Sequence, residues 1–154
     1  MQLYLIRHAH ALDGAVDEAR PLSSKGRAQV RRLAAFLRGS DAFAPAEIWH
    51  SPLMRARETA GLLARHLKLG VQRRDVADLT PAADPHRILR RFAGEARSLA
   101  LVGHDPHLSA LASLLVAGDE APPAFALKKC SVLALDRVGR HWVVRWLVPP
   151  ELLA

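Results

Sequence analysis

The alternation of short apolar runs with longer amphipathic segments limits this chain to few folds. Residues 3–6 and 98–103 are short and largely apolar, 47–50 (EIWH) resembles another short strand, and each run ends abruptly in polar residues. Such runs are typical of strands buried in a parallel sheet. The segments between them carry apolar residues at helical spacing, for example along 30–37. The pattern predicts strands alternating with helices that cover both faces of one sheet.

The last two expected strands, 131–136 and 141–147, are separated only by a turn at 138–140. A parallel crossover needs about a dozen residues or more, so these strands are expected to form an antiparallel hairpin. A further short strand is expected at 71–73. The fold class is therefore α/β, and we expect a three-layer α/β/α sandwich with a mainly parallel central sheet and a C-terminal antiparallel hairpin.

Capping residues indicate where the helices begin and end. Ser23 or Ser24 can cap the first helix, and Gly39 can end it. Gly70 is expected to end the second helix. The remaining helices are expected around 88–92 and 108–115.

The 154 residues fit a single domain, 1–154. No run approaches the ~18 apolar residues of a spanning helix, and the N-terminus lacks the features of a signal peptide. The lone cysteine, Cys130, excludes an internal disulfide, so a cytoplasmic location is expected. Cys130 lies in an apolar run and is interpreted as a buried hydrophobic residue rather than a nucleophile. The pattern does not fix the oligomeric state, and a monomer is favoured.

The charge is strongly positive, with 22 Lys and Arg against 15 Asp and Glu and a net charge of +7. Such a surface favours anionic partners such as phosphorylated proteins, phosphate esters or nucleic acid. The basic pairs, among them 31–32 and 128–129, are scattered along the chain and are interpreted as a solvated surface. Aromatic residues are few and are not interleaved with them, which argues against nucleic acid as the partner.

Three of the expected strands end in residues suited to a phosphate site. Arg7 and His8 follow the first strand, 51–55 (SPLMR) follows the second, and His104 follows another. Ligands collect beyond the carboxyl ends of parallel strands, so these residues are expected to converge. Guanidinium groups bind phosphate oxygens in pairs, which predicts a cationic pocket for a phosphoryl group. Singly the signals are weak, since 51–52 could merely cap a helix with serine and proline.

The same residues resemble the signatures of the histidine phosphatase superfamily. Residues 7–9 (RHA) resemble its Arg-His-Gly signature, and 22–26 (LSSKG) its Leu-Thr-x-x-Gly element. Residues 51–60 (SPLMRARETA) are similar to its Ser-Pro-x-x-Arg-Ala-x-x-Thr-Ala element, and 102–106 (VGHDP) to its second-histidine element. Order and spacing match. The short connections, together with RPL at 20–22 and DLTP at 78–81, resemble the compact SixA-type phosphohistidine phosphatases.

The resemblance implies that His8 attacks phosphorus and carries a phosphohistidine intermediate, which water then hydrolyses. Arg7, Arg55 and a protonated His104 would hold the phosphoryl oxygens, and cations beside His8 would disfavour its protonation. Arg20 could reach the substrate from its loop or simply remain exposed. Phosphoryl transfer needs mainly positioning and charge stabilisation, so neither a metal nor a cofactor is expected.

The general acid is left open. The family position points to Asp78, and Asp105 follows the second histidine, as the donor does in the phytase-like branch. Asp105 with Pro106 also reads as an ordinary helix start, which is the favoured interpretation. An ester needs a proton donor for its leaving group, whereas the imidazole of phosphohistidine can depart after protonation by solvent or a weak donor. A poorly defined acid therefore favours a phosphohistidine substrate.

Two features depart from the family pattern or compete with it. Ala9 replaces the usual glycine, which matters only if the backbone there needs a positive φ. His8 with His10, and His104 with His107, could instead form a zinc site, but the neighbouring arginines would repel a cation. His10 and His107 are therefore interpreted as polar loop residues. Surface or structural positions are expected for His50, His66, His86 and His141.

The resemblance thus implies a metal-independent phosphatase acting most readily on protein phosphohistidine. A phosphomonoesterase acting on a small metabolite or nucleotide is the alternative among enzymes. A phosphate- or phosphoprotein-binding module without turnover is the alternative of another class, and the complete set of Arg7, His8, Arg55 and His104 argues against it. No membrane partner is expected.

Overall fold

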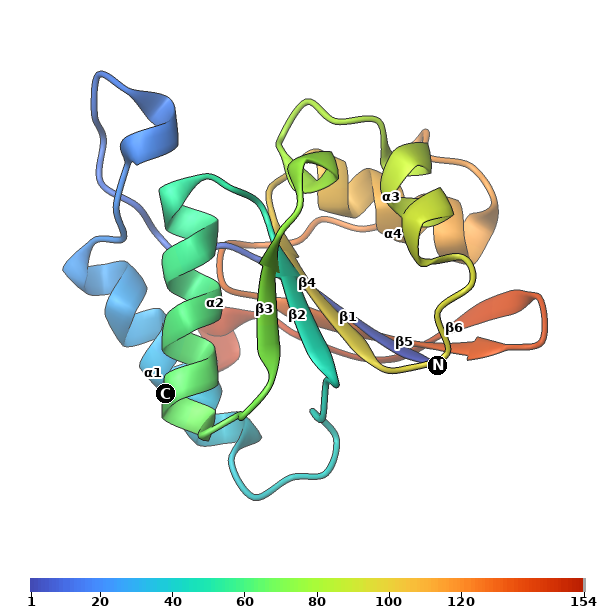
Figure 1. Ribbon diagram of the computed structural model, residues 1–154, viewed down its shortest axis with the longest axis horizontal. Helices are drawn as coiled ribbons and strands as arrows, with labels where there is room; N and C mark the ends of the chain where they lie inside the picture. The colour runs from blue at the N-terminus through green and yellow to red at the C-terminus, as the bar shows by residue number, and fades with distance from the viewer. Residues whose placement is uncertain (154) are drawn as a thin grey trace.

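The computed structural model describes residues 1–153, so Ala154, the last residue of the expected domain, lies outside the described residues. Its sheet has the strand order β3-β2-β4-β1-β5-β6 (Figure 1). Neighbouring strands among the first four pair in parallel, whereas β5 pairs antiparallel with both β1 and β6. The mainly parallel sheet and the C-terminal hairpin are therefore confirmed. The strands are β1 (Gln2–Arg7), β2 (Glu47–His50), β3 (Gln72–Asp75), β4 (Leu99–Gly103), β5 (Val132–Val138) and β6 (His141–Val148).

Helices cover both faces of this sheet, as the expected three-layer sandwich requires (Figure 1). On one face, Tyr4 and Ile6 of β1 share a core cluster with residues of α1 and α2. On the other face, Leu3 and Leu5 share a cluster with residues of α3 and α4. The alternation of β1 side chains between two buried layers explains why its sequence is continuously apolar. The helices are α1 (Ser24–Leu37), α2 (Met54–Leu67), α3 (Pro85–Phe92) and α4 (His107–Ala117), with 3-10 turns η1 (Asp17–Ala19), η2 (Ala77–Leu79) and η3 (Pro150–Leu152).

The helix ends agree with the capping residues in all but one case. Ser23 caps α1 by accepting the backbone N–H of Gly26, and Gly39 follows that helix with a φ of +77°. The end expected at Gly70 is wrong. Helix α2 closes at Lys68, which adopts a φ of +55° and donates its backbone N–H to carbonyl groups of the last turn. A left-handed residue there ends the helix before the glycine is reached.

None of the helices within residues 1–153 combines the length and apolar character needed to cross a membrane.

Candidate active site

His8 lies directly after β1, at the carboxyl end of the parallel strands. Its backbone N–H donates to the carbonyl of Gly103 at the end of β4, at 2.9 Å, which ties the two strand ends together. The Nδ1 atom of its ring lies 2.7 Å from the carbonyl oxygen of Ala9. A carbonyl only accepts hydrogen bonds, so this contact assigns the proton of a neutral His8 to Nδ1. The lone pair is then on Nε2, which can act as a nucleophile.

The surroundings of His8 keep it neutral. Burial lowers the pKa of His8 to about 4, and the positive charges of Arg55, Arg7 and Lys129 act in the same direction. The residue is only 6% exposed. The expected influence of the two arginines is therefore present. Lys129 is an addition that the sequence did not reveal, because its neighbours in the chain indicate only a basic surface pair.

His104 follows β4 and lies beside His8, with the two ring centroids 5.0 Å apart. Its Nε2 is 2.8 Å from the hydroxyl oxygen of Ser51, which follows β2. Ser51 also accepts the backbone N–H of Leu53, and Leu53 rather than Ser51 is the N-cap of α2. The alternative in which Ser51 merely caps a helix is therefore wrong. Ser51 links the ends of β2 and β4 through a contact with His104.

The expectation of a protonated His104 does not hold for the unliganded site. Burial, together with the proximity of His8 and Arg55, lowers the pKa of His104 to about 3. A second positive charge beside Arg55 in a buried position is unfavourable, so both histidines are neutral near pH 7. A bound phosphoryl dianion would favour the proton on His104, since an opposite charge stabilises the charged imidazole.

Arg55 projects from the first turn of α2 and is 5% exposed. Its Nη1 donates to the main-chain carbonyl of Asp17 at 2.9 Å, and its Nη2 donates to the Asp17 carboxylate at 3.2 Å. Asp17 belongs to η1, the single turn in the blue loop at the upper left of Figure 1. Hydrogen bonds from Arg20 and Arg55 lower the pKa of Asp17. An acidic loop therefore contacts the guanidinium expected to bind phosphate.

Arg20 shapes this loop. Its Nε donates to the carbonyl of Leu12 at 2.8 Å and its Nη1 donates to the Asp17 carboxylate at 3.1 Å. The side chain is 22% exposed, so it is neither free in solvent nor directed at His8 by any contact in the described chain. Its connection to the site runs through Asp17, which contacts Arg55.

Arg7 completes the cationic group. Its Nη1 donates to the carbonyl of Leu127 at 2.7 Å and lies 3.7 Å from the Asp105 carboxylate. Its Nε is buried and has no partner within residues 1–153. The structure thus brings Arg7, His8, Arg55 and His104 together from the ends of β1 and β4 and from the helix after β2. In this arrangement the neutral imidazole can attack a bound phosphoryl group, and the two guanidinium groups beside it can hold the phosphoryl oxygens.

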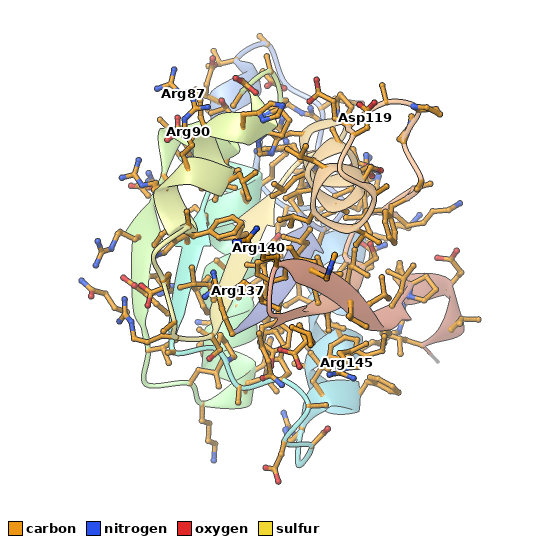
Figure 2. All side chains as sticks on the ribbon, turned by 90° about the vertical axis from the view of Figure 1, so that its right-hand side faces the viewer. Arg87, Arg90, Asp119, Arg137, Arg140 and Arg145 are labelled. Carbon is orange, nitrogen blue, oxygen red and sulfur yellow. The ribbon has the colours of Figure 1, made fainter. Side chains whose placement is uncertain are left out.

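Both candidate acids are engaged by neighbouring side chains. Asp78 in η2 forms an ion pair with Arg87 through one carboxylate oxygen, 2.9 Å from Nε, and accepts a hydrogen bond from Arg91 through the other, at 3.2 Å. Both arginines belong to α3, where Figure 2 labels Arg87. Asp105 accepts the backbone N–H and the hydroxyl of Ser109 in the first turn of α4. Asp105 thus serves the start of this helix, as favoured, although Pro106 is the N-cap.

Neither histidine pair considered as a zinc site belongs to a group of three or more potential ligand residues within residues 1–153. His10 has its Nδ1 2.7 Å from the Ser23 hydroxyl and so contacts the start of α1. The expectation that His107 is a polar loop residue is wrong. His107 is the first residue of α4, is only 2% exposed, and has neither ring nitrogen partnered within residues 1–153. The one group within 1–153 that could hold a cation, an exposed cluster whose ligand atoms lie within 4.8 Å of one another, comprises Asp84, His86 and Glu120.

Two further expectations are confirmed and one departure is explained. Cys130 is fully buried, and burial raises the pKa of its thiol to about 12, so it carries no thiolate near pH 7. His50 is buried with its Nδ1 3.0 Å from the carbonyl of Ser51, which is a satisfied structural position. Ala9 is buried and is not among the positive-φ residues of the described chain, so the absence of glycine there creates no strain.

Comparison with known proteins points in the same direction. A model of the histidine phosphatase superfamily (branch 1) matches residues 3–77. Phosphohistidine phosphatase SixA of Escherichia coli K12 is 29% identical over 155 residues, which cover 97% of this chain and 94% of SixA. An uncharacterized protein of Picosynechococcus is 33% identical over 142 residues, covering 88% of this chain and 84% of that protein.

Solved structures agree in fold. The structure of the protein histidine phosphatase SixA complexed with tungstate matches with a TM-score of 0.85 and 25% identity over 98% of both chains. A SixA homologue from Agrobacterium tumefaciens, itself described as a putative phosphohistidine phosphatase, has a TM-score of 0.81 at 24% identity over 97% of both chains.

The fold and the convergent arginines and histidines define a phosphatase, an enzyme that hydrolyses a phosphoryl bond. The chain belongs to the histidine phosphatase superfamily and, within it, is similar to SixA over nearly its whole length.

Proposed function

We propose that this chain is a metal-independent phosphatase that removes phosphate from protein phosphohistidine through a phosphohistidine intermediate on His8. The observation that carries the proposal is the state of His8, which is neutral, protonated on Nδ1 and placed among Arg7, Arg55 and His104. A nucleophile in this state needs no general base, because Nε2 already carries the attacking lone pair.

The reaction proceeds in two displacements. The lone pair of His8 Nε2 forms a bond to phosphorus while the bond from phosphorus to the substrate imidazole breaks, and the leaving nitrogen takes a proton from solvent. Water then attacks the phosphorus on His8, loses a proton to solvent and releases inorganic phosphate, which regenerates the neutral imidazole. Arg7 and Arg55 hold the equatorial oxygens, and His104 takes up a proton as the dianion binds.

The engagement of both candidate acids supports the phosphohistidine substrate. Asp78 is held by Arg87 and Arg91, and Asp105 is held by Ser109. An alkyl ester needs a donor for its leaving oxygen, whereas a leaving imidazole takes its proton from solvent. Two similar proteins, phosphohistidine phosphatase SixA of Escherichia coli and a protein histidine phosphatase SixA solved with tungstate, a tetrahedral oxyanion like phosphate, favour the same substrate.

The absence of a metal requirement rests on the partners of the histidines. His8 Nδ1 is engaged by Ala9 and His10 Nδ1 by Ser23, while Arg7 and Arg55 repel a cation from the same space. Activity retained after treatment with a chelator supports this part of the proposal. Loss of activity that added zinc restores would overturn it.

The test is a substrate panel of a phosphohistidine peptide and phosphomonoesters, run on the wild type and on Asp78→Asn. We expect the phosphohistidine peptide to be cleaved faster and the Asp78→Asn variant to retain that activity. His8→Ala should abolish turnover of every substrate, whereas the control His141→Ala, at an exposed position on β6, should not. Faster ester cleavage that collapses in Asp78→Asn would favour the phosphomonoesterase with Asp78 as donor.

A binding module without turnover is the alternative of another class. It predicts that His8→Ala keeps its affinity for phosphate and that the wild type shows no phosphate release from any member of the panel.

We also propose a cytoplasmic location for this phosphatase, inferred from its lone, buried Cys130.

A further inference from the structure

A basic groove of about 620 Å³ adjoins the active site. We call it the basic groove and define it by its lining residues, which are Arg7, His10, Lys25, Gln29, Arg32, Lys128, Lys129, Pro150, Glu151 and Leu153. Five of these side chains are cationic and one is a carboxylate. Arg7 belongs both to this groove and to the cationic group around His8. The groove is thus a continuation of the phosphate site.

The fold holds two of the lysines firmly at the entrance. The turn 128–130 precedes β5, and the backbone N–H of Cys130 donates to the carbonyls of both Arg7 and His8, at 3.0 and 3.1 Å. Cys130 has a φ of +64°, and the N–H of Ser131 closes the turn onto the carbonyl of Lys128. Because the turn is hydrogen-bonded to the residues that carry the chemistry, its backbone stays next to His8, and the charge of Lys129 acts on the His8 ring.

The cations of the basic groove are largely unneutralised. Within residues 1–153, Lys25, Arg32, Lys128 and Lys129 have no carboxylate oxygen within 4.0 Å, in contrast to such surface residues as Arg57, whose guanidinium pairs with Asp75. Cations gathered without counter-charges raise the local potential and attract anions. The basic pairs that the sequence scatters are therefore not all equivalent, since Lys128 and Lys129 meet Lys25 and Arg32 of α1 in one place.

We propose that the basic groove binds an acidic segment of the phosphoprotein substrate, adjacent to the phosphorylated side chain held at His8. This inference rests on the proposed function and names a property of its substrate, namely carboxylates close to the phosphorylated residue. The geometry behind it is the shared Arg7, which lets one extended partner occupy the phosphate site and the groove together.

The character of the groove favours a protein over other anions. Its cations come from α1, from the turn 128–130 and from the end of β1, and Lys25, Arg32 and Lys128 are exposed. Sites for small molecules enclose their ligand with a few fixed polar groups, whereas exposed and spread cations suit the rim of a protein interface. No Phe, Tyr or Trp side chain is among the described lining residues, so the groove lacks the large aromatic rings on which nucleic acid bases usually stack.

The test compares two synthetic phosphohistidine peptides, one flanked by Asp and Glu and one by Asn and Gln at the same positions. We expect the wild type to cleave the acidic peptide with about a tenfold higher kcat/KM at low ionic strength, and expect salt to reduce that preference. The double variant Lys25→Glu/Arg32→Glu should lose the preference or invert it, mainly through KM.

The matched control is Arg65→Glu/Arg73→Glu, which changes the net charge equally. These two exposed arginines line a separate basic hollow formed by α1, α2 and β3. The control should keep the preference of the wild type. If the control loses it to the same extent, only overall charge matters and the proposal is overturned. Equal rates on the two peptides in the wild type would overturn it too.

Failure of the proposed function can be told apart from failure of this inference. If phosphohistidine is not cleaved but phosphomonoesters are, the same acidic and neutral peptides carrying phosphoserine or phosphotyrosine measure the groove directly. A short single-stranded DNA that competes more strongly than the acidic peptide, and does so less well against Lys25→Glu/Arg32→Glu, would assign the groove to nucleic acid and overturn the proposal.

Discussion

The guanidinium of Arg55 donates to both the main-chain carbonyl and the carboxylate of Asp17, at 2.9 and 3.2 Å. The carboxylate thus occupies a donor that a phosphoryl oxygen would need. Arg20 also donates to Asp17, so the η1 loop is held against the site by two arginines. An incoming phosphoryl group must compete with this carboxylate for Arg55.

This competition predicts that Asp17→Asn binds oxyanions more tightly. The amide removes a negative charge beside the phosphate site and weakens the hold on Arg55. We expect the inhibition constants of inorganic phosphate and tungstate to fall by roughly two- to fivefold, the size expected for an exposed ion pair. Competitive inhibition measured with one phosphorylated substrate gives both constants.

Asp13→Asn is the matched control, because Asp13 lies near Arg20 but makes no contact with Arg55. It should leave both inhibition constants unchanged. Weaker oxyanion binding by Asp17→Asn would show instead that Asp17 orients Arg55 for phosphate, and would contradict the competition.

The low pKa of His8 predicts a loss of stability in mild acid. The pKa is about 4 in the folded protein, against an ordinary value of 6.5. Between these pH values the unfolded chain binds more protons at His8 than the folded protein does. The stabilisation is therefore complete above pH 6.5 and is lost as the pH falls towards 4. By about pH 4 the loss from His8 alone should reach roughly 2 to 3 kcal/mol.

Urea unfolding at pH 7 and at pH 4.5 measures this loss, and His8→Gln isolates it. Carboxylates and the other buried histidines, His104 and His107, contribute to the pH dependence of both proteins, so the difference between the two proteins reports on His8. We expect the variant to lose less stability than the wild type on acidification. An identical loss in the two proteins would mean that His8 has an ordinary pKa in the folded state.

The sequence was sufficient to locate the residues that follow the strands. Arg7, His8, Ser51 and His104 all stand at carboxyl ends of strands whose apolar pattern is unmistakable, and parallel pairing forces such ends together. Arg55 lies in the first turn of α2, shortly after the end of β2. The convergence of these positions is predictable because it depends on short-range patterns and on a single rule of sheet topology.

The contacts that the sequence did not reveal depend on loops and on burial. Nothing in the residues around Asp17 indicates that η1 turns back onto Arg55, because a loop path is decided by tertiary hydrogen bonds. The hydrogen bonds of the Cys130 backbone to Arg7 and His8 bring Lys129 close to His8. The positive φ of Cys130 could not be predicted, because positive φ values are usually found at glycine. His107 was assigned to a polar loop because histidine is commonly exposed, whereas the start of α4 is buried.

The contact between Ser51 and His104 predicts a positioning role for the serine. The Ser51 hydroxyl lies 2.8 Å from His104 Nε2 and is fully buried. In Ser51→Ala the His104 imidazole can still take up a proton, but it loses the hydroxyl that fixes its orientation. We expect kcat to fall about tenfold while KM changes little, with a loss of about 1 kcal/mol in stability for the buried hydrogen bond.

Steady-state kinetics and urea unfolding together separate this role from a general loss of structure. Ser98→Ala is the control, since Ser98 makes hydrogen bonds to Ala44 and Ala46 at the opposite end of β4. It should change stability by a similar amount and leave kcat unaltered. If Ser51→Ala retains full kcat, the contact has no part in turnover.

Gly26 is expected to be the glycine least tolerant of substitution in the described chain. A Cβ added there would collide with the carbonyl oxygen of His10. That oxygen belongs to the main chain and the Cβ is fixed to the helix backbone, so neither can move aside as a flexible side chain would. The first turn of α1 packs directly on the His10 segment, where Ser23 donates its N–H to the same carbonyl. Gly26→Ala must separate α1 from the loop that leaves His8, and should reduce the free energy of unfolding by about 3 kcal/mol or more.

Gly70→Ala supplies the comparison, because no atom lies within 4 Å of a Cβ at Gly70 and its φ is not positive. The free energy of unfolding of that variant should lie within about 0.5 kcal/mol of the wild-type value or slightly above it, since alanine restricts the unfolded chain. Activity adds a second measurement. Displacement of the His10 segment shifts the backbone that follows His8, so Gly26→Ala should lose kcat even at temperatures where it remains folded. A Gly26→Ala protein as stable and as active as Gly70→Ala would show that α1 can move away from His10 without disturbing the end of β1.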